Sequence, residues 1–234
     1  TTLAATLTAT TLPTMSLDRT WLKFAATTSG AAFSQQTQEQ QIRLLQLGAG
    51  TVTWTAASTQ PWLIVSPASG TGSATLTISV AFASGLPASG NATGFINLAL
   101  SGAGGPVGPI TVHLRTLTTT VAAVPIGTFD TPFDGATGIT GSIPVTGWAI
   151  DDVEVRAVRI LRDPVAGEGP GQVFIGDAVF VEGARPDVAM AFASTPRSSR
   201  AGWGYLMLTN FLPNQGNGTF KLYAYADDAD GHTT

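Results

Sequence analysis

The 234-residue sequence contains no cysteine and only two histidines. Without cysteine the protein has no disulfide, no thiolate zinc site and no cysteine nucleophile, although export from the cell stays open. His113 lies between two apolar residues of an alternating stretch, which points it to solvent, and His232 is almost terminal. The sequence also has no Gly-x-Ser-x-Gly elbow, so a Ser-His-Asp hydrolase is not expected. We predict that the protein is not an enzyme.

Charged residues are also scarce. They make up 11% of the sequence, against roughly 25% in a typical soluble domain. Residues 1–118 carry four basic and two acidic residues (net +2), and residues 119–234 carry seven basic and thirteen acidic ones (net −6). Opposite charges on the two halves favour head-to-tail contacts between copies. No basic patch is interleaved with aromatic residues, so nucleic acid is not an expected partner.

Long hydrophobic runs are absent as well. No run approaches the roughly 18–20 apolar residues of a membrane-spanning helix, so we expect no membrane span. The sequence begins with Thr1 and shows no signal peptide, which indicates a mature product, a fragment or a trimmed chain.

What the sequence does contain is short stretches in which apolar and polar residues alternate. Residues 51–56 place Val52, Trp54 and Ala56 on one face and three threonines on the other. The same period of two recurs at residues 75–80, 110–114, 153–160 and 220–226. Turns rich in Gly, Pro, Ser and Asn, such as residues 66–72 and 212–218, separate the stretches. This pattern is typical of antiparallel β-sandwiches.

The predicted fold is therefore all-β, with two tandem immunoglobulin-like β-sandwiches. Residues 1–15 form an N-terminal strand extension, residues 16–118 the first sandwich and residues 119–234 the second, with a linker near residues 116–125. Residues 35–47 favour helix by composition but could equally form a strand. Residues 185–192 place Pro and Asp where a short helix would begin.

The first half contains the segments 50–56 and 61–72, the latter with the run Trp-Leu-x-Val-Ser-Pro-x-Ser-Gly-x-Gly. Over about residues 16–115 it resembles the BACON family of bacterial sandwich modules. The resemblance implies either carbohydrate binding, the role that the family's name reflects, or a spacer role. One departure is Trp21, where such modules usually carry a small polar residue. Alternation sends Leu22 and Phe24 inward and Trp21 outward.

The second half, about residues 125–234, is similar to the immunoglobulin-like domains repeated in large bacterial surface proteins. The matching segments are residues 129–132, 145–152, 185–188, 202–205 and 212–214. The resemblance implies a spacer or adhesin stalk with no common catalytic set. Relatives continue through one more strand after the segment matching residues 226–234. We therefore expect this sandwich to lack its last strand.

The first twelve residues alternate like a strand, with Leu3, Ala5, Leu7 and Ala9 on one face. We expect that this strand of one subunit completes the second sandwich of the next by β-augmentation, which would build a filament. The alternative is that these residues are the remainder of a preceding domain.

Among the aromatic residues, Trp54, Trp148 and Trp203 are expected in the cores. Trp21 and Trp62 are the candidate partner-binding residues, Trp62 because it follows Pro61 and could lie at a rim. Burying an exposed Trp against a protein partner is worth a few kcal/mol, and stacking on a sugar is the alternative.

The acidic residues offer candidates for chemistry. Asp151, Asp152 and Glu154 are the nearest carboxylate cluster, and we interpret them as turn residues that support the backbone rather than as a glycosidase pair. Residues 227–231 resemble the start of a calcium loop. Asp228 and Asp230 are therefore weak calcium candidates, with Asp130 or Asp134 as further ligands, and ordinary turn residues are the alternative. No other cofactor is expected.

These observations predict a non-catalytic structural or adhesive unit, located extracellularly or on the cell surface. It would be a filament subunit assembled by strand exchange or a stalk module of a larger protein, with head-to-tail self-association. The first alternative is a carbohydrate-binding module with a glycan partner. A more distant one is an accessory domain of a secreted hydrolase.

Overall fold

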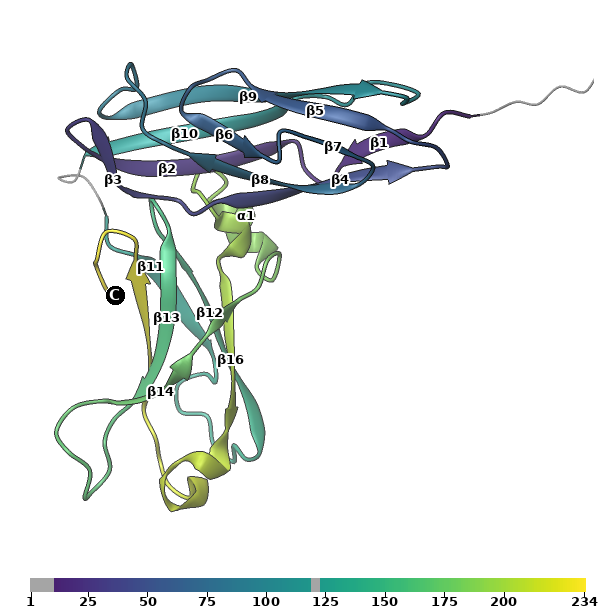
Figure 1. Ribbon diagram of the computed structural model, residues 1–234. Coiled ribbons are helices and arrows are strands. Elements are labelled where there is room, and N and C mark those ends of the chain that lie inside the picture. Colours follow the sequence, from purple (N-terminus) through teal and green to yellow (C-terminus); the bar gives the residue numbers. More distant parts are fainter. Residues whose placement is uncertain (1–10, 119–122) are drawn as a thin grey trace, which may run out of the picture. The chain divides into compact units, whose positions relative to one another are not determined.

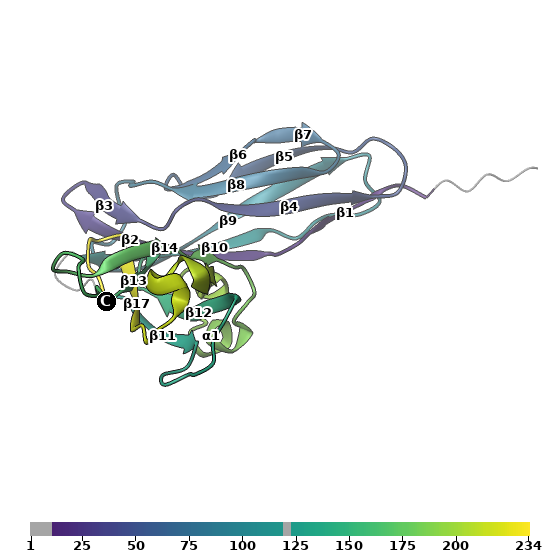
Figure 2. The same ribbon diagram turned by 90° about the horizontal axis from the view of Figure 1, so that it is seen from below.

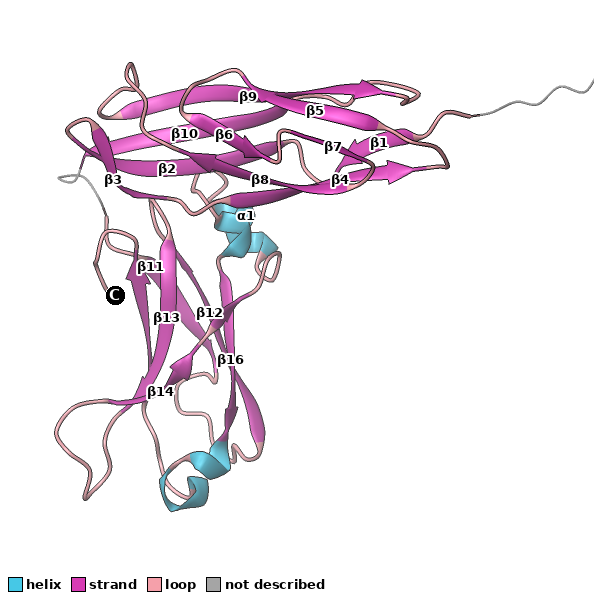
Figure 3. Ribbon diagram, viewed as in Figure 1, coloured by secondary structure: helices cyan, strands magenta, loops and turns pink. Residues whose placement is uncertain are grey.

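The computed structural model describes residues 11–118 and 123–234, and nearly all of its regular structure is strand, which confirms the all-β fold class (Figure 3). The described residues form two compact units. One contains the residues up to Leu22 with Gln38–Leu86 and Asn91–Leu114, and the other contains Lys23–Thr37, Pro87–Gly90 and the residues from Arg115 onward. The predicted boundary at residue 118 stays a prediction.

The first ten strands form two sheets with the orders β1-β4-β8-β6 and β3-β2-β10-β9-β5-β7 (Figures 1 and 2). Their bounds are β1 Thr14–Leu17, β2 Trp21–Ser29, β3 Ala32–Gln36, β4 Gln40–Leu47, β5 Thr53–Ser58, β6 Leu63–Ser66, β7 Ser69–Thr71, β8 Ala74–Val80, β9 Gly90–Ser101 and β10 Ile110–Thr118. The segment that could have been helix therefore forms β3 and β4. In β4 the apolar residues Ile42 and Leu44 are buried at a spacing of two, which only a strand produces.

Alternation also places the other predicted residues of these strands correctly. Leu22 and Phe24 are buried and Trp21 is 54% exposed. Trp54 is buried, and His113 is exposed.

The Ser-Gly-x-Gly turn of the first half has a packing reason. Trp54 lies opposite Gly70 in the β5–β7 pair, and a Cβ on Gly70 would come within 2.4 Å of the indole ring. The Trp54 Nε1–H donates to the carbonyl of Gly72 at 3.0 Å. Glycine at residue 70 leaves the space that the indole ring occupies.

The remaining strands form sheets with the orders β11-β12-β16-β15 and β14-β13-β17 (Figure 1). Their bounds are β11 Ile126–Thr131, β12 Ser142–Ile150, β13 Val155–Arg162, β14 Val173–Asp177, β15 Val179–Phe180, β16 Gly202–Leu208 and β17 Leu222–Asp228. The helix α1, Pro186–Ala191, confirms the predicted short helix, and 3₁₀ turns follow at Ser198–Arg200, Thr209–Phe211 and Pro213–Gly216.

The core of this second sandwich is formed by inward-facing residues of both sheets, including Val145, Val158, Ile160, Trp203 and Met207. Trp203 is therefore in the core, as predicted. Trp148 is only partly buried and packs against Phe192, with ring centroids 5.6 Å apart, beside a smaller apolar cluster. Among the described residues, no helix combines the length and the apolar character needed to cross a membrane.

An ion pair in the loop after β13 makes stability depend on pH. The Arg162 guanidinium donates two hydrogen bonds to the Glu168 carboxylate, at 2.6 and 2.7 Å, and the Val165 N–H donates a third at 2.8 Å. The bonds from Arg162, and then that from Val165, lower the pKa of Glu168 to about 2. An unfolded-state glutamate has a pKa of about 4.3, so the contribution is complete above about pH 5 and is lost as the pH falls towards 2.

We therefore expect Glu168→Gln to destabilise the protein more at pH 6 than at pH 2.5. Urea midpoints of the wild type and the variant at both pH values measure this difference. An equal difference at the two pH values would contradict the stabilising role of the ionised carboxylate.

Candidate functional site

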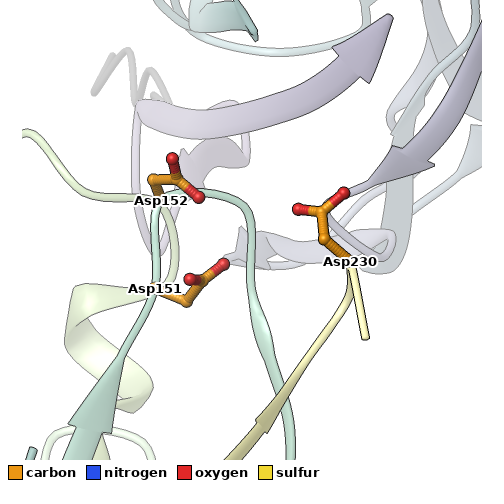
Figure 4. A group of neighbouring side chains, drawn as sticks. All are labelled: Asp151, Asp152 and Asp230. Carbon is orange, nitrogen blue, oxygen red and sulfur yellow. The ribbon is translucent and has the colours of Figure 1, made fainter. Parts of the chain in front are cut away.

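Three carboxylates converge at one end of the second sandwich. Strand β12 ends at Ile150, and Asp151 and Asp152 begin the turn that leads into β13. Asp230 lies in the C-terminal tail that follows β17. One oxygen of each carboxylate lies within 4.8 Å of the other two. Figure 4 shows that the three side chains point toward one another from these two segments.

One oxygen of each carboxylate is held in place by a hydrogen bond. Asp151 Oδ2 accepts the N–H groups of Val153 at 2.9 Å and Glu154 at 3.1 Å. Asp152 Oδ2 accepts the N–H of Ala123 at 3.2 Å. Asp230 Oδ1 accepts the Oγ1–H of Thr27, in β2, at 2.9 Å. The turn role predicted for Asp151 is thereby confirmed, and these bonds orient the second oxygen of each carboxylate.

The second oxygens are Asp151 Oδ1, Asp152 Oδ1 and Asp230 Oδ2. All three are buried, and no hydrogen-bond donor of the described residues reaches them. The whole Asp151 residue is only 5% exposed. Burying a carboxylate oxygen without a donor is costly, because it loses hydration and gains nothing in return.

The pKa values of two of these carboxylates reflect the same cost of burying a charge. Burial raises the pKa of Asp151 to about 6, and the charges of Asp152 and Asp228 act in the same direction. Burial also raises the pKa of Asp152, with the charges of Asp230 and Asp228 adding to it. A positive charge among the three oxygens would reverse this penalty. A donor set made only of carboxylate oxygens suits hard cations such as Ca²⁺ or Mg²⁺.

The calcium pair expected from the sequence, Asp228 with Asp230, is only half present in this cluster. Asp228 Oδ1 accepts the backbone N–H of His232 at 2.7 Å, and Oδ2 lies 2.8 Å from its Nδ1. Neither suggested further ligand belongs to the cluster: Asp130 is hydrogen-bonded to Arg185 and Thr128, and Asp134 is exposed and lies outside the three-carboxylate group. In the sequence, the feature that points to this cluster is the acidic pair 151–152, which the pattern alone indicates only as part of a turn.

Beside this turn a further carboxylate, that of Glu154, is surrounded by arginines. Glu154 is 1% exposed, and its side chain forms ion pairs with Arg156 at 3.1 Å, Arg197 at 3.3 Å and Arg200 at 3.4 Å. Arg200 also lies over the Phe180 ring, 4.5 Å from its centroid. Glu154 therefore links the β12–β13 turn to the segment between α1 and β16.

Strand β17 is an edge strand of its sheet, because β13 is the only strand in the described part of the chain that is hydrogen-bonded to it. The N–H and C=O of Ala226 point away from β13 and pair with Thr234 at 2.9 and 3.0 Å. Backbone groups alternate along a strand, so those of Leu222 and Ala224 also point away from β13. Leu222 and Ala224 are partly buried against the core. The tail thus pairs with one end of this edge, and no backbone group of residues 11–118 or 123–234 pairs with the outward-facing groups of Leu222 and Ala224.

The two tryptophans predicted to bind a partner differ in exposure. Trp21 is exposed, whereas Trp62 is only 3% exposed, so its expected position at a rim is wrong. A Cβ on Gly94 would lie 3.1 Å from the Trp62 ring. The indole therefore occupies space that a side chain at residue 94 would fill. Leu3, Ala5, Leu7 and Ala9 lie outside the described residues.

Comparison with known families identifies part of the first half. The model of the viral BACON domain matches residues 22–95. The first module is BACON-like. The resemblance of the second half to surface-protein domains stays a prediction. No curated protein matches the chain.

Solved structures share only a low level of similarity with the chain. A PapD-like domain of human CEP192 is 16% identical, with 50% of this chain and 95% of that chain covered and a TM-score of 0.35. The Pseudomonas aeruginosa CupB2 chaperone is 11% identical, with 93% and 96% covered and a TM-score of 0.31. A GH5 xyloglucanase of Bacteroides ovatus is 17% identical, with 45% of this chain and 19% of that chain covered and a TM-score of 0.30.

Proposed function

We propose that this protein is a non-catalytic structural or adhesive unit outside the cell, and that copies join by adding a strand to the edge of β17. The observation that carries the proposal is the outward-facing backbone of Leu222 and Ala224 at that edge. Unpaired edge groups are a template for β-augmentation. The BACON-like module accords with a spacer or adhesive role.

The side chains at this edge favour an apolar, alternating strand as the added element. Leu222 and Ala224 pack against the core cluster that contains Ile160, and Ala224 lies directly opposite Ile160 in β13. A strand added beside them would place every second side chain over that core. The N-terminal segment, with Leu3, Ala5, Leu7 and Ala9 on one face, has this pattern.

Two variants test the proposal by size-exclusion chromatography with light scattering and by electron microscopy. The wild type is expected to form large species or filaments. Deletion of residues 1–12 removes the donor strand, and Ala224→Pro removes an N–H at the open edge without removing a bond to β13. Both variants are expected to be monomeric, with at least a ten-fold loss of assembled material.

Ala224→Val is the matched control, because it changes the same side chain and keeps the N–H, so it should assemble. Melting curves show whether Ala224→Pro is folded, and the deletion decides the matter if it is not. Assembly of the deletion variant at the wild-type level would contradict the proposal. A monomeric wild type whose Trp fluorescence is quenched by a glycan would instead favour the carbohydrate-binding alternative, for which exposed Trp21 offers a stacking surface.

A further inference from the structure

We propose that Asp151, Asp152 and Asp230 form a calcium site that ties the C-terminal tail to the β12–β13 turn. This inference is independent of assembly at the β17 edge. It rests on two observations: three carboxylates from two distant segments converge, and each of them carries a buried oxygen that no hydrogen-bond donor of the described residues reaches (Figure 4).

The distances fit a single ion. Calcium–oxygen distances are about 2.3–2.6 Å, so two oxygens bound to one ion lie at most about 5 Å apart. One oxygen of each of the three carboxylates lies within 4.8 Å of those of the other two. Even at the full 4.8 Å separation, three such oxygens lie about 2.8 Å from a common centre. Side-chain shifts of a few tenths of an ångström therefore bring all three to one ion, and water would complete its usual six to eight ligands.

The chemistry of the three residues favours calcium over other metals. Zinc sites use cysteine or histidine ligands, whereas the nearest histidine, His232, has its Nδ1 2.8 Å from Asp228 Oδ2. Magnesium usually keeps several waters and takes one or two carboxylates. Calcium accepts several carboxylates in a flexible geometry, whereas magnesium demands a near-ideal octahedron, so a set of three carboxylates suits calcium better.

The burial of Asp151 separates this cluster from an ordinary acidic surface patch. Surface carboxylates are hydrated, whereas Asp151 Oδ1 is shielded from solvent and has no donor among the described residues. The second oxygen of the same carboxylate is fixed by the N–H groups of Val153 and Glu154. The free oxygen therefore cannot turn away to find a donor without breaking the turn.

An ion at this position would hold the tail through Asp230. The residues that follow Asp230 fold back on β17, where Thr233 bridges Asp227 and Thr234 pairs with Ala226. Calcium would thus order the tail along β17 and stabilise the second sandwich as a whole.

Calorimetric titration of the chelator-treated protein with CaCl₂ tests the proposal, together with melting curves in calcium and in chelator. We expect one equivalent to bind with a Kd on the order of 10⁻⁴ M, as in extracellular calcium modules. Saturating calcium should raise the Tm by about 3 °C or more. MgCl₂ at the same concentration should produce a clearly smaller shift.

Asp152→Asn and Asp230→Asn should each weaken calcium binding at least ten-fold and abolish the Tm shift. Because each also removes a repelling charge, neither should lower the Tm in chelator, which a purely structural role would predict. Asp134→Asn is the matched control, since it removes the same charge from an exposed residue outside the cluster, and it should keep the wild-type response.

Three results would overturn the proposal. The first is no heat and no Tm shift at 10 mM calcium. The second is a calcium response that persists in both cluster variants or that disappears in Asp134→Asn. The third is an equal response to magnesium.

Discussion

Replacing Glu154 by Gln is expected to destabilise the second sandwich by about 3 kcal/mol. Breaking a buried ion pair by removing one partner typically costs about 3–5 kcal/mol, because the remaining charge is left uncompensated. Glu154 is buried and balances three guanidiniums, those of Arg156, Arg197 and Arg200. These arginine side chains are 20–30% exposed and can recover some hydration, so we place the effect at the low end of the range.

Urea unfolding followed by circular dichroism and Trp fluorescence measures this change. The matched control is Asp177→Asn, which removes the same charge from an exposed residue of β14 and should change stability by no more than about 0.5 kcal/mol. Similar midpoints for Glu154→Gln and Asp177→Asn would show that the arginines do not depend on Glu154.

Gly147→Ala, made as a separate variant, is expected to lower the free energy of unfolding by about 3 kcal/mol. The reason is that the sheet has no space for a Cβ at this residue. A Cβ there would lie 2.0 Å from the carbonyl oxygen of Thr128 and 2.4 Å from the Trp203 ring. Both neighbours are fixed, one as backbone of the paired strand β11 and the other as a core side chain. Either β11 or the core packing around Trp203 must move.

Gly204→Ala is the control for this prediction. Gly204 lies in the adjacent strand β16, paired with Thr146, and its nearest neighbour would be 3.6 Å from a new Cβ, which is an ordinary contact. Replacing a strand glycine by alanine at such a position reduces the entropy lost on folding, so we expect an unchanged or slightly higher Tm. Equal losses in the two variants would mean that the cost at residue 147 is not steric.

The features that could be predicted from the sequence are those set by near neighbours along the chain. Alternation placed Leu22 and Phe24 inside and Trp21 outside, because successive side chains of a strand leave opposite faces. Pro186 and Asp187 marked the beginning of α1 for a similarly local reason, since proline suits the first turn of a helix.

Features that depend on a distant segment could not be predicted in this way. Trp62 follows a proline and was expected at a rim, but the space beside Gly94 buries its ring. The carboxylate of Asp151 supports the turn as predicted, whereas that of Asp152 accepts the N–H of the distant Ala123. Nothing near them in the chain indicated Asp230, which reaches them only after β17 has crossed the sandwich.

The sequence by itself determined the fold class, the inward and outward faces of most strands and the absence of any thiol chemistry. It could do so because side-chain alternation and residue composition are properties of single segments. Only the tertiary structure decided which charges meet, bringing Glu154 among three arginines and Asp230 beside Asp151 and Asp152. Electrostatic contacts act over a few ångströms in space, and the pairing of strands sets those distances whatever the separation along the chain.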